Sequence, residues 1–208
     1  MSETESSRLG RLEQAVTLRK PLGEGLLLRV LALLPAVLVV LAGADVALAQ
    51  QPALWTMEMR LGVLAHDVPD LWSGFRLERG VDINGEILFG SGLAVLGGRL
   101  RPAIGASVNT AGYTSKGYID ARWEIDCPSG IFFGLGLGAA VHNGNLDPTD
   151  PDRKALGSRV LFHIPFEVGL RLDERQSISI YFEHTSNAYT KASNEGLDNI
   201  GVRYGVRF

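Results

Sequence analysis

Residues 159–171 of this 208-residue chain read RVLFHIPFEVGLR, and this stretch decides the fold. From Val160 to Leu170 every second residue is apolar, and polar residues such as His163 and Glu167 lie between them. An apolar period of two predicts a β-strand, whereas a helix would repeat every 3.6 residues. Seven further segments alternate in the same way, namely residues 55–63, 81–89, 100–108, 119–125, 131–141, 178–182 and 200–208. The sequence therefore predicts an all-β protein with eight strands.

The polar faces of these segments favour a membrane barrel over a soluble sandwich. They carry eight basic residues (Arg60, Arg101, Lys116, Arg122, Arg159, Arg171, Arg203, Arg207) and eight acidic ones (Glu58, Asp82, Glu86, Asp120, Glu124, Asp126, Glu167, Glu183). Balanced charge suits a small barrel whose lumen is filled by paired side chains while its apolar face meets lipid. The last strand ends in Phe208, as in the assembly signal of outer-membrane barrels. We expect an eight-stranded antiparallel transmembrane β-barrel, formed as one domain by residues 50–208.

The connections between the segments are unequal in length. Long loops are expected at residues 66–80, 110–115, 142–157 and 189–196, and short turns at 127–130 and 173–176. Outer-membrane barrels show this asymmetry, with long loops outside and short turns on the periplasmic side. The connection formed by residues 91–98 is longer than a periplasmic turn requires. The glycines Gly134, Gly136 and Gly138 have the spacing of a strand, and they predict small inward residues rather than a phosphate-binding loop.

The first 49 residues have the features of an export signal. Five basic residues precede an unbroken apolar stretch at residues 30–42, and Ala47-Leu48-Ala49 then forms a small-x-small cleavage site. The apolar stretch is short of the roughly 20 residues that a transmembrane helix needs. The sequence predicts a cleaved secretory signal peptide at residues 1–49 and export through the inner membrane of a Gram-negative bacterium.

Composition excludes several other classes of function. The net charge of −3 gives no reason to expect nucleic acid as a partner. The single cysteine, Cys127, cannot form an internal disulfide. The acidic run at residues 147–152 lacks the glycine and the distal glutamate of a calcium loop, so we interpret it as a solvated loop. We expect no metal and no cofactor.

Candidate chemistry lies at the outer end of the last two segments. On the even-numbered face of residues 178–186, three apolar side chains are followed by His184 and Ser186. Asp198 has the parity of Ile200 on the returning strand, so pairing places it beside His184 or Ser186 on the same outward face. Serine, histidine and a carboxylate are the parts of nucleophilic acyl transfer. Polar residues near the outer interface cost only about 0–1 kcal/mol, so these could also be ordinary boundary residues.

The motif His184-Thr185-Ser186-Asn187, with an acid fourteen residues after the histidine, resembles the lipid A 3-O-deacylase (PagL) family. This family consists of eight-stranded outer-membrane barrels with a His-x-Ser-Asn motif near the end of the seventh strand. The resemblance implies that Ser186 is the nucleophile, His184 the general base and Asn187 a candidate oxyanion donor. Asp198 stands where the family usually has glutamate. Glu195, three residues earlier, is the second candidate for the acid.

The resemblance also implies a substrate and a place of action. The substrate is lipid A of lipopolysaccharide, the bond is the ester of its 3-position acyl chain, and the place is the outer membrane. Neither metal nor cofactor is implied, and a homodimer is left open. Two alternatives remain at this point: a non-catalytic structural or adhesive outer-membrane barrel, and an esterase or phospholipase acting on other outer-leaflet lipids. A pore is disfavoured by the charge-filled lumen.

Overall fold

A computed structural model describes residues 57–208. The predicted export signal and the first residues of the first predicted strand lie outside this range. The strands are β1 (Met57–Ala65), β2 (Val81–Phe89), β3 (Leu93–Val95), β4 (Gly98–Asn109), β5 (Lys116–Asp126), β6 (Ile131–His142), β7 (Val160–Arg171), β8 (Gln176–Ser186) and β9 (Leu197–Arg207). Within the described residues no helix is long and apolar enough to cross a membrane.

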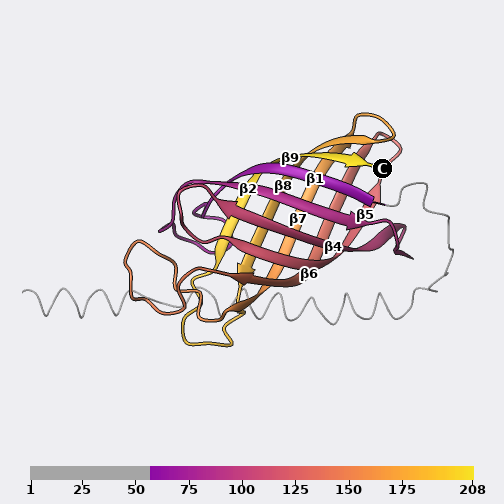
Figure 1. Cartoon of the computed structure of the whole chain (residues 1–208). Coiled ribbons are helices and arrows are strands. Elements are labelled where there is room, and N and C mark those ends of the chain that lie inside the picture. The colour runs from indigo at the N-terminus through magenta and orange to yellow at the C-terminus, as the bar shows by residue number, and fades with distance from the viewer. Residues whose placement is uncertain (1–56) are drawn as a thin grey trace, which may run out of the picture. The chain divides into compact units, whose positions relative to one another are not determined.

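Eight of these strands close into an antiparallel barrel (Figure 1). The sheet order is β2-β1-β9-β8-β7-β6-β5-β4, and pairing of β2 with β4 joins its ends. The two ends of the described chain meet where the Met57 amide donates to the Phe208 carbonyl at 3.1 Å. The eight barrel strands have 9 to 12 residues, and a tilted membrane-crossing strand needs about 9–11. The predicted eight-stranded antiparallel barrel is confirmed.

The ninth strand, β3, accounts for the long connection at residues 91–98. It pairs with the start of β4, and Val95 faces Gly98 across a two-residue turn. Both turn residues, Leu96 and Gly97, have positive φ, at 50° and 75°. Tight hairpin turns favour this left-handed backbone because its twist matches that of the strands. The segment is therefore a small hairpin with the first residues of β4, which pair with β5 on their other side.

The outward faces of the barrel are apolar, as the alternation predicts. Leu61 and Val63 of β1 are more than half exposed, and so are Ile119 of β5 and Val202 of β9. Exposed apolar side chains of this number on one protein indicate contact with something other than water. On a closed barrel of this size, that contact is the acyl region of a bilayer.

Ion pairs fill the inside of the barrel at mid-height. The carboxylate of Glu167 lies 2.5 Å from a guanidinium nitrogen of Arg60, 2.6 Å from one of Arg122 and 2.9 Å from one of Arg203. Ser179 of β8 donates its hydroxyl to the same carboxylate at 2.6 Å. Gly136 makes room for this cluster, since a Cβ there would lie 2.9 Å from Cδ of Arg122. The predicted small inward glycines and paired lumen charges are both present.

Further ion pairs lie toward the outer end of the lumen. Glu183 of β8 faces Lys116 at 2.8 Å and His163 at 3.0 Å. Two of the predicted lumen charges lie at the ends of the barrel. Arg159 precedes β7 and donates to the carbonyls of His142 and Gly144. Asp126 is at the exposed rim, where it pairs with Arg171. Asp126 keeps the inward parity of its buried register partner Phe132, and its exposure follows from its place at the open end of the barrel. Arg159 departs from the strand pattern because it lies before the first residue of β7.

We predict that Glu167→Gln strongly destabilises the barrel. Removing one partner of a buried ion pair leaves the other charges uncompensated and costs about 3–5 kcal/mol. The matched control is Asp126→Asn, because this carboxylate is 53% exposed and an exposed pair contributes only about 0–1 kcal/mol. Urea unfolding in lipid vesicles, followed by tryptophan fluorescence, measures both variants. Equal midpoints for the two variants would contradict this account of the lumen.

Four long loops gather at the end of the barrel opposite Phe208 (Figure 1). We call them loop 1 (residues 66–80), loop 2 (110–115), loop 3 (143–159) and loop 4 (187–196). The short turns after β5 and β7 lie at the other end. The predicted loop asymmetry is confirmed, and it places the outer ends of β8 and β9 beside loop 1 and loop 4.

Candidate active site

The register of β8 and β9 brings the candidate residues together. His184 and Asp198 are direct partners across the strand pair, and Ser186 lies two residues further along β8 on the same face. The distance from Nδ1 of His184 to Oδ1 of Asp198 is 2.6 Å, and that from Nε2 to Oγ of Ser186 is 2.9 Å. A carboxylate can only accept, so Nδ1 carries the hydrogen and Nε2 is left to accept from the serine hydroxyl. This is the arrangement that activates a serine nucleophile.

The three side chains differ in their access to the surroundings. Asp198 is fully buried, His184 is 4% exposed, and Ser186 is half-buried. Ser186 is therefore the most accessible of the three residues to a molecule approaching from outside. The acid and the base are shielded from water, which strengthens the electrostatic interaction between them.

Loop 1 supplies this shielding, which the sequence pattern did not reveal. The backbone amides of Trp72 and Ser73 each donate to Oδ2 of Asp198 at 2.6 Å. The indole of Trp72 stacks on the imidazole of His184 with ring centroids 4.4 Å apart and planes 11° from parallel. Backbone donors leave no trace in residue type, so periodicity could not find them. The signal in the sequence is the presence of three large apolar residues, Leu71, Trp72 and Phe75, in a predicted outer loop. In the structure all three are exposed.

Two buried carboxylates hold loop 1 in place. Asp67 accepts from the amides of Leu77 and Glu78 at 2.7 and 2.9 Å, and it pairs with Nζ of Lys154 at 3.3 Å. Glu78 accepts from His66 at 3.0 Å, from the amide and hydroxyl of Thr114 at 2.9 Å each, and from the Lys154 amide at 3.0 Å. Because these partners belong to loops 1, 2 and 3, the three loops form one connected unit.

The loop unit is held by ionised groups. Burial alone would raise the pKa of Glu78, but hydrogen bonds from His66, Thr114 and Lys154 outweigh it and lower the pKa to about 2. Burial alone would lower the pKa of His66, but its hydrogen bonds to Asp82 and Glu78 raise it. Glu78 is therefore a carboxylate at neutral pH, which is the form that accepts all four hydrogen bonds.

The side chains of Asn187 and Glu195 are bonded to residues of loop 3 and loop 4 rather than to the triad. Nδ2 of Asn187 donates to the carbonyls of Leu156 and Ser193 at 2.8 and 2.6 Å. To act as an oxyanion donor, the side-chain amide of Asn187 would have to give up one of these bonds. The Glu195 carboxylate accepts from the Ala155 amide at 2.6 Å. Both side chains join loop 4 to loop 3, and it is Asp198 that contacts His184.

An apolar wall begins next to Ser186. On β7, Phe162 is the register partner of Ser186, Ile164 that of His184, and Phe166 that of Phe182. Phe162 and Phe166 are nearly half exposed. The hydroxyl of Ser186 therefore lies at the upper end of an apolar track that runs down the outside of the barrel.

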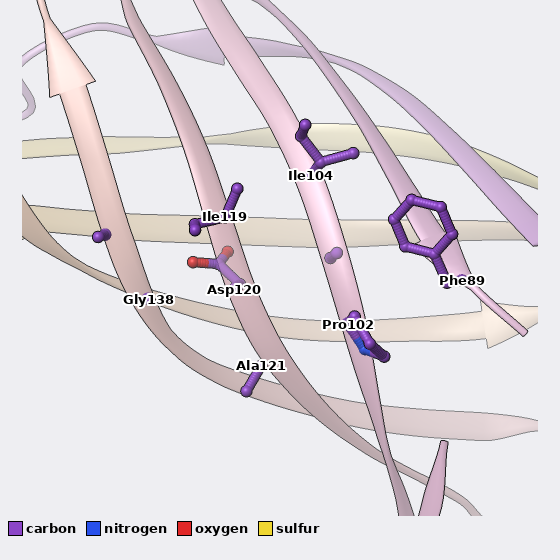
Figure 2. A pocket seen from close by; sticks show the side chains of 9 residues that line it. Phe89, Pro102, Ile104, Ile119, Asp120, Ala121 and Gly138 are labelled. Atoms are coloured by element: carbon purple, nitrogen blue, oxygen red, sulfur yellow. The ribbon is translucent and has the colours of Figure 1, made fainter. Parts of the chain in front are cut away.

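A hollow of about 580 Å³ lies elsewhere on the wall, across β2, β4, β5 and β6 (Figure 2). Its lining is mostly apolar and includes Phe89, Ile104 and Ile119 around the small residues Pro102 and Ala121. β7 separates β6 from β8, so the hollow is not part of the Ser186 site. Among residues 57–208, no three His, Cys, Asp or Glu side chains are grouped so as to hold a metal ion.

Fold and site together define a small outer-membrane-type β-barrel with a serine, a histidine and an aspartate in contact on its outer wall. A comparison with known protein families supports this description. The model described as lipid A 3-O-deacylase (PagL) matches residues 72–207, and the chain belongs to this family. This match confirms the resemblance found in the motif at the end of β8. The family and the fold together indicate that the protein is located in the bacterial outer membrane.

Comparison with solved structures found similar proteins. The crystal structure of the outer membrane enzyme PagL is 19% identical, with a TM-score of 0.56 over 73% of this chain and 99% of that chain. The N-terminal β-barrel domain of Pseudomonas aeruginosa OprF is 13% identical, with a TM-score of 0.49 over 73% and 96%. A de novo designed transmembrane β-barrel is 12% identical, with a TM-score of 0.48 over 76% and 98%. Among curated protein sequences, no significant match was found.

Proposed function

We propose that this protein removes the 3-position acyl chain of lipid A by a serine hydrolase mechanism. Ser186 is the nucleophile, His184 the general base and Asp198 the acid that orients the imidazole. The observation that carries this proposal is the continuous contact from Asp198 through His184 to Ser186 on the outer wall. The family supports lipid A as the substrate.

In the first half of the reaction, Oγ of Ser186 attacks the carbonyl carbon of the ester. Its proton passes to Nε2 of His184, 2.9 Å away, and the carbonyl electrons move to the oxygen. Asp198 stabilises the resulting imidazolium through the hydrogen bond at Nδ1. The tetrahedral intermediate then expels the sugar 3-oxygen, which takes the proton from His184. The products of this half are 3-hydroxyl lipid A and an acyl ester on Ser186.

In the second half, water takes the place of the sugar hydroxyl. The oxygen of the water attacks the acyl ester while His184 accepts one of the water protons. This proton then passes to Oγ of Ser186 when the ester bond breaks. A free fatty acid leaves and the serine is restored. The protein's own side chains carry every proton in this sequence.

The position of the site suits a substrate that is a neighbour in the membrane. Ser186 lies on the outer wall, and the track of Phe162, Ile164 and Phe166 descends from it. An acyl chain can lie against this wall while its ester reaches Ser186, so no deep pocket is required. All three reacting residues come from one chain, and the proposal requires no second copy.

The proposal also includes a role for Asn187 and a role for the first 49 residues. Asn187 positions loop 4 against loop 3 through Leu156 and Ser193. Residues 1–49 direct export and are removed after Ala49, and residues 50–208 remain as the mature barrel. This part rests on the sequence pattern alone, because those residues precede the described range.

Mass spectrometry of lipid A tests the proposed function. Outer membranes from a host that expresses the protein are compared with those from the same host carrying an empty vector. We expect lipid A that has lost one 3-hydroxyacyl group, together with the released 3-hydroxy fatty acid. Release of fatty acid from phospholipid, with lipid A intact, would indicate a phospholipase. Unchanged lipids with a folded barrel at the cell surface would indicate a structural protein.

A further inference from the structure

Trp72 of loop 1 contacts two members of the triad at once. Its indole covers His184, and its backbone amide donates to Asp198. The reaction described above uses neither contact. We propose that Trp72 is a positioning residue that fixes the His184–Asp198 pair and stabilises the imidazolium formed during acyl transfer. The inference rests on the proposed function, because it assigns Trp72 a part in that same site.

The stacked rings are arranged to favour a charged imidazole. Their centroids are 4.4 Å apart and their planes 11° from parallel, so the π face of the indole lies against the π face of the imidazole. A cation within about 6 Å of a tryptophan ring is attracted by its quadrupole, and more strongly when water is excluded. His184 is 4% exposed. The attraction is therefore larger when His184 holds the Ser186 proton than when it is neutral.

The backbone of loop 1 fixes the other partner of His184. Oδ2 of Asp198 accepts from the amides of Trp72 and Ser73, which leaves Oδ1 to face Nδ1 of His184. A carboxylate held by two donors cannot rotate freely, so its second oxygen stays aimed at the imidazole. Loop 1 thus orients the acid and covers the base with adjacent residues.

Loop 1 is itself held firmly enough to perform this role. The Val68 amide donates to the Asp198 carbonyl at 2.8 Å, which ties the start of the loop to β9. Asp67 and Glu78 anchor its two ends through the contacts described above. Gly196 permits close packing from the other side, because a Cβ there would lie 3.1 Å from Cβ of Ser73 and 3.2 Å from Cε1 of His184. The position of Trp72 is therefore set before any substrate arrives.

Preorganisation of this kind acts on the transition state. An interaction that strengthens as charge develops on His184 raises kcat, whereas one that merely contacts the lipid changes KM. The indole also lies 6.3 Å from the Phe166 ring, at the edge of the apolar track. A kinetic test must therefore separate a role toward His184 from a role as a wall for the acyl chain.

Three substitutions at Trp72 separate ring chemistry from volume. Trp72→Leu keeps an apolar side chain but removes the π face, and Trp72→Phe restores a flat ring. We expect Trp72→Leu to lower kcat for lipid A by about 10- to 30-fold with KM unchanged, as for the loss of a desolvated cation–π contact. Trp72→Phe should remain within about 3-fold of the unmodified protein. Trp72→Met replaces Trp72→Leu if the latter fails to assemble.

Leu71→Ala is the matched control. Leu71 precedes Trp72 in the same loop and is 50% exposed, and the substitution should leave kcat unchanged. Equal loss of kcat in Trp72→Leu and Trp72→Phe would overturn the inference, since a ring would then bring no rescue. A rise in KM with kcat unchanged would also overturn it, and would make Trp72 part of the wall for the substrate.

A fluorophosphonate probe gives a second readout that needs no lipid A. Oγ of Ser186 forms a bond to phosphorus, fluoride leaves, and His184 accepts the serine proton, so the labelling rate reports activation of the serine. We expect Trp72→Leu to label about 10- to 30-fold more slowly, Trp72→Phe and Leu71→Ala at nearly the original rate, and Ser186→Ala not at all.

The two readouts distinguish failure of this inference from failure of the proposed function. If Ser186 labels but lipid A is not deacylated, the proposed substrate is wrong, and the labelling rates still decide the role of Trp72. If lipid A is deacylated and Trp72→Leu labels at the original rate, the inference alone is wrong. If Ser186 does not label at all, Ser186 is not an activated nucleophile and both are overturned.

Discussion

Replacing Ser186 by alanine should lower kcat for lipid A deacylation by about 10⁶-fold, because loss of the nucleophile of a triad removes nearly all of its acceleration. The structure indicates that the barrel will tolerate the change. Ser186 is the last residue of β8, it is half-buried, and its hydroxyl contacts Nε2 of His184. Loss of that hydroxyl leaves the lumen ion pairs and the strand register intact.

Two measurements test the Ser186 prediction together. Release of 3-hydroxy fatty acid from purified lipid A in mixed micelles gives kcat, and urea unfolding in vesicles gives stability. The matched control is Ser193→Ala, because Ser193 contributes its carbonyl rather than its hydroxyl to Asn187. We expect full activity from the control and an unchanged unfolding midpoint for both variants. Substantial deacylation by a folded Ser186→Ala protein would remove Ser186 as the nucleophile.

The second large effect is expected for Asp198→Asn, with a fall in kcat of about 10⁴-fold. The amides of Trp72 and Ser73 both donate to one oxygen of Asp198, so the carbonyl oxygen of an asparagine would remain on that side. Its NH₂ group would then face Nδ1 of His184. The imidazole would have to accept there and carry its proton on Nε2, the nitrogen that must take the proton of Ser186. The base would be present in the wrong tautomer.

Glu195→Gln is the control that decides between the two candidate acids. Its carboxylate contacts the Ala155 amide at 2.6 Å, and an amide oxygen can keep that hydrogen bond. We expect kcat to change by less than about 3-fold, within the range of surface substitutions. The same initial-rate measurement on lipid A applies to both variants. A large loss in Glu195→Gln together with an active Asp198→Asn would reverse the assignment of the acid.

The fold was predictable because burial in a barrel depends on the parity of each residue. A shift of one residue would turn an entire strand over, so the apolar period defined eight strands and their faces. β3 was not predicted, because three residues are too few to show a period. Arg159 was assigned to the lumen wrongly, because it lies before β7 and parity has no meaning beyond the end of a strand.

The candidate site was predictable to the extent that strands build it. Parity placed His184, Ser186 and Asp198 on one face, and the register of β8 and β9 brings the acid and the base together. The contribution of loop 1 was not predictable in the same way. It depends on backbone amides at residues 72 and 73 and on the path of a loop, which only long-range contacts with Asp67 and Glu78 determine.

Alternation along β8 has a consequence for how such a surface enzyme can evolve. Glu183 points into the lumen and binds Lys116 and His163, while the next residue, His184, points out toward the lipid. Mutations deep inside the barrel, far from any substrate atom, can therefore change turnover by moving the strand that carries the base. The outer wall next to the site, with Phe162 and Phe166, meets the substrate directly. The lumen side of β8 thus affects the reaction only through the position of the backbone, whereas the outer side carries the reacting groups.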